Sequence, residues 1–198
     1  MKFTLRERKD LFNAGLMISL AFAILLSGGF GLFFNFSLNF LVIFIIALFT
    51  AGIGFLLHEL MHKYVAQNYG LFAEFKAFYN MLWLAIGLSL FGFIIAAPGA
   101  VMISGRVTKE RNGKISLAGP MTNVVLALIF LILILAFRVN GVFGVFLGFG
   151  LTINSLLAAF NMIPTMPFDG AKILGWDKKI YTITTIIAVG LFIVSFFV

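Results

Sequence analysis

The chain contains no cysteine, which excludes disulfide bonds, thiolate nucleophiles and every cysteine-based zinc site. Charge is also scarce, since only 11% of the 198 residues are charged and only 7 are acidic. There are four prolines and two histidines. Any chemistry that needs an imidazole must therefore use His58, His62 or both.

Apolar residues dominate the composition of the chain. They make up 62% of the chain, with 26 phenylalanines and a mean hydropathy of +1.13. A soluble domain of this size cannot hide so much apolar surface, so we predict an all-α polytopic membrane protein in contact with the lipid bilayer. The net charge of +7 comes from short basic segments beside apolar runs. Basic residues at such places are typical of signals that orient membrane helices, so we predict no nucleic-acid partner.

Long uncharged runs predict about five transmembrane helices. Residues 11–57 carry no charge and are about twice as long as the ~20 residues that one crossing needs. A polar break at Asn35–Asn39 divides this run in two. The basic segment at the start precedes an apolar run without an Ala-x-Ala cleavage site, so we expect a retained anchor. The predicted helices are approximately Leu11–Phe34, Leu38–Tyr64, Ser116–Phe137 (with Pro120 in its first turn), Val142–Ile163 and Ile180–Val198.

The segment between the second and third predicted helices is expected to re-enter the membrane without crossing it. Residues 72–78 alternate charged and apolar side chains as a strand does, and Pro98-Gly99 interrupts the uncharged run 80–105. If this run does not cross, 13 of the 14 basic residues lie on one side of the membrane, as the positive-inside rule favours. We therefore predict a cytoplasmic-side re-entrant segment with β character that borders the active site.

His58-Glu59-x-x-His62 is the chemical centre of the sequence. Four residues of an α-helix turn by about 400°, so the two imidazoles project from one face. Glu59 lies about 60° around the helix from His62, within reach of a water molecule held near the imidazoles. This pattern is typical of a zinc site with a carboxylate general base. The pattern can also arise by chance, but polar groups are costly in so apolar a stretch.

Two imidazoles need a third ligand, and Asp169 is the best candidate among the acids. The other acidic residues are close to basic ones, whereas Asp169 follows an apolar helix and two prolines. Lys172 places Asp169 at nearly the same membrane depth as His62 if the re-entrant topology is correct. His58, His62 and Asp169 are therefore predicted to meet at one level.

Three motifs together resemble the site-2 protease family of intramembrane zinc metallopeptidases. They are His58-Glu59-x-x-His62, Gly119-Pro120-x-x-Asn123 and Asn161-x-x-Pro164-x-x-Pro167-x-Asp169-Gly170, in family order. The resemblance implies that His58, His62 and Asp169 bind one Zn²⁺ per chain and that Glu59 is the general base. It also implies cleavage within or next to a transmembrane segment of a protein substrate. Ala171 and Met166 depart from the family pattern, and the PDZ and CBS modules of some members are absent.

The expected protein is thus a single membrane-embedded metalloprotease domain over residues 1–198, with a catalytic core at roughly 38–177. We expect a multi-pass protein of the cell membrane whose N-terminus and active site face the cytoplasm. Asn123, Asn161 and Gly170 are expected either to support ligands and substrate or only to hold helices together. An unwound substrate is expected to pair with residues 72–78 or 96–104 as an added strand. The alternative function is a metal-binding transporter or a proteolytically inactive homologue.

Overall fold

The computed structural model of the chain describes residues 1–30, 38–94, 98–138 and 140–198. It is mostly helical, with one two-stranded sheet. The chain forms two compact units. The first unit contains residues 1, 57–73 and 103–198, and the second contains residues 2–56 and 74–102.

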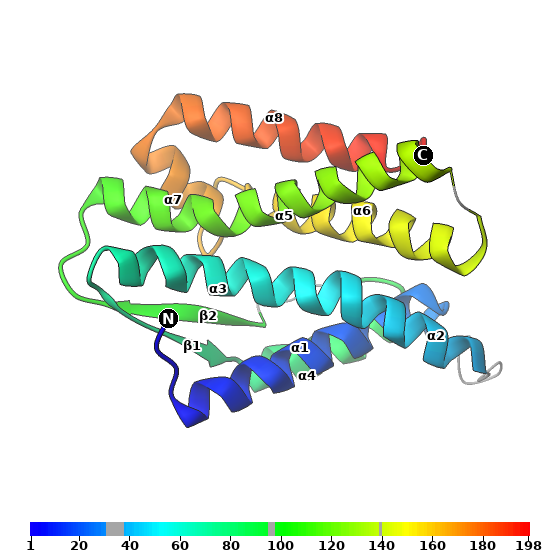
Figure 1. Cartoon of the computed structure of the whole chain (residues 1–198). Helices are drawn as coiled ribbons and strands as arrows, with labels where there is room; N and C mark the ends of the chain where they lie inside the picture. Colours follow the sequence, from blue (N-terminus) through cyan, green and yellow to red (C-terminus); the bar gives the residue numbers. More distant parts are fainter. Residues whose placement is uncertain (31–37, 95–97, 139) are drawn as a thin grey trace. The chain divides into compact units, whose positions relative to one another are not determined.

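The first unit is built on four helices and most of a fifth. α5 packs against α6 and α7, and α6 packs against α8 (Figure 1). The buried core of this unit consists of small and branched apolar side chains. Its members are Val124, Ala127, Leu151, Ala158, Ala188 and Leu191. The helices are α3 (Ile53–Asn68, from residue 57 onward), α5 (Lys109–Phe137), α6 (Gly141–Asn161), α7 (Asp169–Trp176) and α8 (Lys178–Val194).

α5 begins earlier than predicted, at Lys109 instead of Ser116. The Thr108 side chain caps the helix by accepting a hydrogen bond from the Arg111 amide at 3.3 Å. Pro120 therefore lies inside the helix and not in its first turn, so that prediction was wrong. A proline removes one helical hydrogen bond, a loss that membrane helices tolerate where neighbouring groups satisfy the freed backbone.

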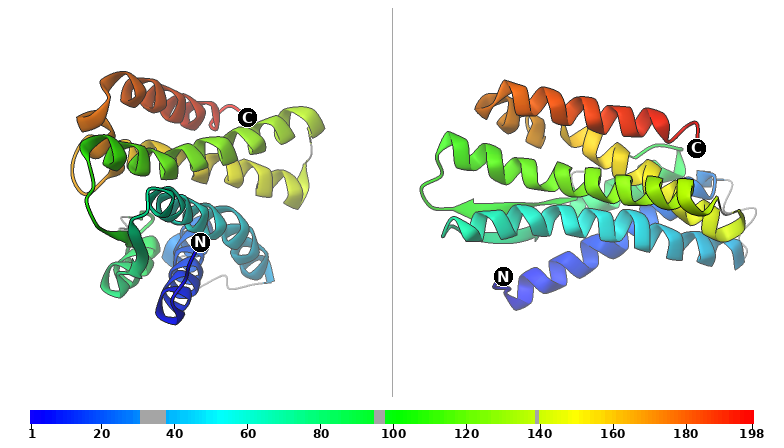
Figure 2. Two further views of the ribbon diagram at one scale, coloured as in Figure 1. Left: turned by 60° about the vertical axis from the view of Figure 1, so that its left-hand side comes forward. Right: turned by 45° about the horizontal axis from the view of Figure 1, so that its top comes forward.

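The second unit packs three helical segments around α1. These are α2 (Leu38–Ala47), the π-helical turn η2 (Leu48–Gly52) and α4 (Tyr79–Leu90) (Figure 2). α1 itself runs from Leu5 to Leu26, so it begins before the predicted Leu11, and the prediction of helix at residues 27–30 was wrong. Residues 31–34 of the predicted helix lie outside the described residues. The helix ends at Ser27, because the two glycines that follow adopt positive φ angles. Residues 35–37 of the predicted polar break Asn35–Asn39 lie outside the described residues, and its last two residues belong to α2.

The segment predicted to be re-entrant forms a strand, a helix and a second strand. β1 (Phe72–Ala77) pairs with β2 (Gly99–Ser104), as the alternating pattern and the Pro98-Gly99 break indicated. Between them, residues 79–90 form α4, so the expected β character does not extend there. A helix of 12 residues is about 18 Å long, which is too short for a hydrocarbon core of about 30 Å.

The edge of β1 that faces away from β2 is covered by side chains. In the second unit, the amide of Phe75 donates to Glu7 at 2.9 Å and the amide of Ala77 donates to Asp10 at 3.3 Å. In the first unit, the Gln67 side chain donates to the carbonyl oxygen of Ala73 at 3.4 Å. Backbone groups of alternate residues share one edge of a strand, so these contacts fill the outer edge of β1.

Four helical stretches are long and apolar enough to cross a membrane. They are residues 5–26, 39–68, 109–137 and 141–161. Only 22% of the most apolar part of α5 is buried inside the protein, which leaves a large apolar surface for lipid. α8 has 17 residues, so its crossing, predicted as the fifth, stays a prediction.

Candidate metal centre

α3 presents His58 and His62 one helical turn apart. The Nε2 atoms of the two imidazoles lie 3.0 Å from each other, and both side chains are buried. The rings meet edge to face, with their centroids 4.6 Å apart. Both Nε2 atoms thus converge on one point, as the spacing of the motif predicts.

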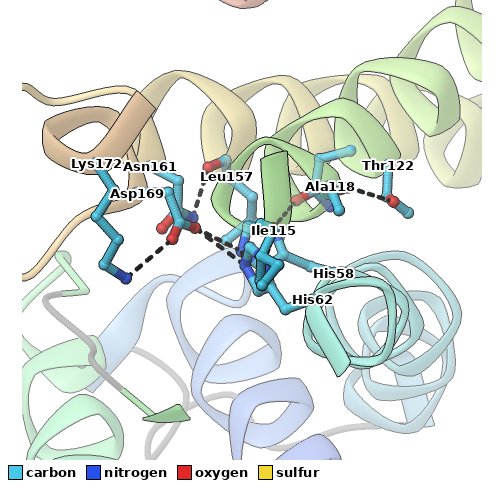
Figure 3. Close-up of polar contacts among 10 residues, drawn as sticks. His58, His62, Ile115, Ala118, Thr122, Leu157, Asn161, Asp169 and Lys172 are labelled. Carbon is cyan, nitrogen blue, oxygen red and sulfur yellow. Dashed lines mark hydrogen bonds and ion pairs between the residues drawn. The ribbon is translucent and has the colours of Figure 1, made fainter. Parts of the chain in front are cut away.

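Asp169 reaches the same point from the first residue of α7. Its Oδ2 atom lies 3.4 Å from His58 Nε2 and 3.0 Å from His62 Nε2 (Figure 3). The carboxylate is buried as well. In the described part of the chain, this group of three is the one found with side-chain atoms placed to hold a metal ion.

The backbone of α5 decides which nitrogen of His62 carries its hydrogen. His62 Nδ1 lies 2.8 Å from the carbonyl oxygen of Ile115, and a carbonyl oxygen only accepts hydrogen bonds. Nδ1 is therefore the donor. The lone pair of Nε2 then faces Asp169 and His58. A hydrogen bond from Nδ1 to a backbone carbonyl oxygen is typical of histidines that bind a metal through Nε2.

The two Nε2 atoms and Asp169 Oδ2 are arranged for binding a metal ion and not for sharing a proton. A single proton can bridge one of the three pairs, whereas a cation at their centre satisfies all three at once. Tetrahedral zinc with bonds of about 2.0–2.1 Å sets its ligand atoms roughly 3.3 Å apart, close to the distances seen here. Two imidazole nitrogens and one carboxylate oxygen, with a fourth position open, form the ligand set of a catalytic zinc site.

Asp169 is held in its charged form by its neighbours. Burial alone raises the pKa of the Asp169 carboxyl group, but His62 and His58 lower that pKa well below its usual value. Lys172 contacts the other carboxylate oxygen, with Nζ 3.4 Å from Oδ1 (Figure 3). One oxygen of Asp169 thus faces the imidazoles and the other faces an ammonium group.

Glu59 lies beside this cluster. It follows His58 on α3 and is 8% exposed. Glu59 lies within electrostatic range of His58, Asp169 and Lys172. A buried carboxylate at this place can accept a proton from a water molecule near the imidazoles.

Comparison with known proteins places the chain in a family. A protein of Methanocaldococcus jannaschii named "Putative zinc metalloprotease MJ0611" is 44% identical over 191 residues, which cover 96% of this chain and 94% of that protein. A second protein of this organism, "Zinc metalloprotease MJ0392", is 32% identical over 62% of this chain and 31% of its own length. The chain belongs to this zinc metalloprotease family. No family model and no solved structure matches it.

In this member of the family, α5 approaches the imidazoles closely at Gly119. A Cβ atom at this position would collide with the Nε2 atoms of both His58 and His62. Gly119 therefore lets the helix backbone lie against the imidazoles. The Gly119-Pro120 motif was noted in the sequence, but its contact with both imidazoles was not foreseen.

Two of the three supporting residues that the sequence singled out have clear structural contacts. Asn123 Oδ1 lies 2.6 Å from His58 Nδ1 in a fully buried position. A Cβ atom on Gly170 would collide with the Met162 carbonyl, so this glycine allows α7 to start against the end of α6. Asn161 donates to the Leu157 carbonyl at 2.9 Å and appears beside Asp169 in Figure 3. Its contact with substrate stays a prediction.

Two residues near the centre were not predicted to support it. Asn154 is a polar residue in an apolar helix, and its Oδ1 atom accepts a hydrogen bond from Asn123 Nδ2 at 3.1 Å. Lys172 was used only as a marker of membrane depth. The sequence signal for Lys172 was available, because residues three apart on a helix are neighbours and Lys172 follows Asp169 at that spacing.

Proposed function

We propose that the chain is an intramembrane zinc endopeptidase of the site-2 protease type. It hydrolyses a peptide bond within or next to a transmembrane segment of a membrane protein. One observation carries the proposal: the Nε2 atoms of His58 and His62 meet Asp169 Oδ2 in a buried group. Both histidines are on a helix long and apolar enough to cross a bilayer.

In this proposal, three residues bind the metal and a fourth transfers the proton. His58, His62 and Asp169 would hold one zinc ion per chain, which, when bound, polarises the substrate carbonyl and makes water more acidic. Glu59 takes the proton of the attacking water and returns it to the leaving amine. Lys172 holds the second oxygen of Asp169, so a single oxygen is left for the metal.

The proposed site opens toward the cytoplasm. In the re-entrant topology, 13 of the 14 basic residues, together with the N-terminus, are on the cytoplasmic side of the cell membrane. His58 precedes Lys63 by five residues on α3, a rise of about 8 Å. The site therefore lies a short distance inside the interface, where water for hydrolysis can reach it.

An unwound substrate segment pairs with β2 in this proposal. A transmembrane helix hides its amides in hydrogen bonds, so a substrate must open locally before attack and then needs new backbone partners. Side chains already cover the outer edge of β1. β2 is therefore the better of the two predicted strands for pairing with substrate.

The central experiment compares wild type with Glu59→Gln in liposomes that contain a single-span substrate. We expect both proteins to bind zinc and only the wild type to cleave. Glu110→Gln is the matched control, because Glu110 is exposed and pairs with Lys114 at the start of α5. A wild type that binds zinc but cleaves nothing across a panel of single-span substrates would favour the transporter or inactive-homologue alternative.

A separate experiment tests the strand that receives substrate. The absence of native cysteine allows single-cysteine variants at Met102 on β2 and at Phe72 on β1, both exposed. Met102→Cys should form disulfide crosslinks with a cysteine near the cleaved bond of the substrate, and Phe72→Cys should not. Crosslinks at Phe72 alone would assign the substrate to β1.

A further inference from the structure

Basic residues gather at one end of the first unit, where α5 begins and where α7 meets α8 (Figure 1). Residues 106–114 and 175–179 contain six basic residues and two acidic ones, which leaves a surplus of four positive charges. Five of the basic residues are exposed, and the side chain of the sixth, Lys114, is 42% exposed. We call these two segments the basic corner. Its basic residues are Arg106, Lys109, Arg111, Lys114, Lys178 and Lys179.

Side chains join the two segments of the basic corner. The Trp176 side chain packs against α5 at Gly113, where a Cβ atom would collide with it. Lys114 Nζ lies 5.9 Å from the centre of the Trp176 ring. Lys109 extends to the end of α7, because its Cε atom lies 4.0 Å from the place of a Cβ atom on Gly175. Cations of α5 thus lie directly beside the residues that lead into α8.

The two acidic residues of the basic corner have partners within it. Glu110 pairs with Lys114 one turn further along α5. The Asp177 carboxylate accepts hydrogen bonds from the amides of Lys179 and Ile180 at 2.8 and 3.0 Å, which caps α8. The surplus of positive charge is therefore not balanced inside the corner.

Aromatic rings indicate that the basic corner lies at the depth of the lipid headgroups. Besides Trp176 under Lys114, the Tyr69 ring lies under the Arg111 guanidinium, with Cζ 5.3 Å from the ring centre. Tryptophan and tyrosine are enriched where a membrane meets water, and their rings attract cations. A topology signal needs only a number of charges on one side of the membrane, whereas these two cations have defined positions. The corner therefore has the features of a binding surface.

An exposed apolar face continues from the basic corner along α8. Ile183 and Ile186 follow Lys179 by four and seven residues, a spacing that places all three on one side of the helix. The two isoleucines are 49% and 66% exposed. Positive charge is thus followed along one side of α8 by apolar surface. A phospholipid has the same order, with a phosphate at one end and acyl chains at the other.

We propose that the basic corner binds an anionic phospholipid, with the headgroup beside Lys109 and Lys179 and an acyl chain along Ile183 and Ile186. Clusters of about four to eight basic residues next to a membrane helix are typical of segments that bind acidic lipids. A zwitterionic headgroup carries its own cation, so the surplus charge of the corner favours an anionic lipid. A soluble phosphate would match the charge but not the apolar face. The proposal goes beyond peptide hydrolysis and does not depend on the zinc site.

Fluorescence of Trp176 in liposomes tests the proposal. The chain has two tryptophans, and Trp83 is exposed on α4, so Trp83→Phe leaves Trp176 as the reporter. The full-length protein is reconstituted in phosphatidylcholine with brominated phosphatidylglycerol or brominated phosphatidylcholine at the same mole fraction. Bromine quenches only nearby tryptophan, so the two series give a relative binding constant. We expect it to favour phosphatidylglycerol by about 5-fold or more.

Charge variants in the Trp83→Phe background locate the binding surface. Lys109→Gln/Lys179→Gln should bring the relative binding constant close to unity, and Lys109→Arg/Lys179→Arg should keep the preference. Arg8→Gln/Lys9→Gln is the matched control, because it removes two positive charges from exposed positions on α1. Equal quenching by the two lipids before any charge is removed would overturn the proposal. An equal loss of preference in the two glutamine variants would do so as well.

Sodium phosphate and sodium chloride, compared at equal ionic strength, separate a lipid from a soluble phosphate as the ligand. The two salts screen charge alike, so quenching by brominated phosphatidylglycerol should be the same in both. Relief of that quenching by phosphate alone would assign the corner to a soluble phosphate and overturn the lipid proposal. Zinc and peptide cleavage take no part in these measurements, so failure of the proposed function leaves their outcome unchanged.

Discussion

His62 Nε2 lies 3.0 Å from Asp169 Oδ2, although more than one hundred residues separate the two in sequence. The contact joins the C-terminal part of the apolar stretch 39–68 to the first residue of a short helix. Both side chains are buried, and His58 approaches the same carboxylate oxygen. Burying polar groups costs free energy unless they have partners. A cation bound between the imidazoles and the carboxylate would offset that cost.

Asp169→Asn should abolish zinc binding without unfolding the protein. The substitution keeps the size of the side chain but removes the negative charge that the two imidazoles face. Zinc content of the purified protein, measured by mass spectrometry, should fall from near stoichiometric to background. Asp177→Asn is the control, since Asp177 caps α8 through the amides of Lys179 and Ile180. Undiminished zinc in Asp169→Asn would require another third ligand.

Gly119→Ala should weaken zinc binding through one added methyl group. That group would collide with both imidazoles, so one ring must move away from the centre. Gly148→Ala on α6 is the matched control, because its Cβ atom would meet open space. In that variant, alanine should raise the free energy of unfolding by up to about 1 kcal/mol through helix propensity. Chelator competition and thermal unfolding of both variants test this, and equal zinc affinities would contradict it.

Lys172→Met should reduce zinc affinity by about 10-fold or more, because the second oxygen of Asp169 loses its ammonium partner. That oxygen can then turn toward the metal, so cobalt-substituted protein should show the weaker visible absorption of a higher coordination number. Lys172→Arg should restore much of the affinity, and Lys178→Met at the start of α8 serves as the control. A cobalt spectrum identical to that of the wild type would show that Lys172 does not orient Asp169.

Opposite ends of α5 should be accessible from opposite sides of the membrane. The absence of native cysteine makes Lys109→Cys and Asn140→Cys direct reporters of topology. With a membrane-impermeant maleimide, Asn140→Cys should be labelled in intact cells and Lys109→Cys only after the membrane is opened. Labelling of Lys109→Cys from outside would overturn the re-entrant topology and the cytoplasmic position of the site.

The residues of the metal centre were predictable because each is conspicuous in its surroundings. A histidine pair with helical spacing, directly after the uncharged run 11–57, has few explanations other than a site. Asp169 was found by a similar argument, since its position after an apolar helix sets it apart from the other acids. Helix positions followed from the length of apolar runs, although α5 began earlier because Thr108 caps it.

Contacts that depend on backbone groups or on the turning of an amide were not predictable. Nothing in the sequence shows that Glu7 and Asp10 accept from amides of β1, because any strand offers such amides. α4 was missed since an apolar run of its length fits a strand, a helix or a loop. Asn154 looks like any polar residue in a membrane helix until Gly150 and Asn123 are seen on either side of its amide.

The covered edge of β1 also limits how copies of the protein can associate. A two-stranded sheet with two open edges could pair with a neighbour on each side and so form an open-ended polymer in a crowded bilayer. Here Glu7, Asp10 and Gln67 occupy one edge, so pairing can proceed at β2 alone. Two copies that meet through β2 form a closed pair, and growth stops there.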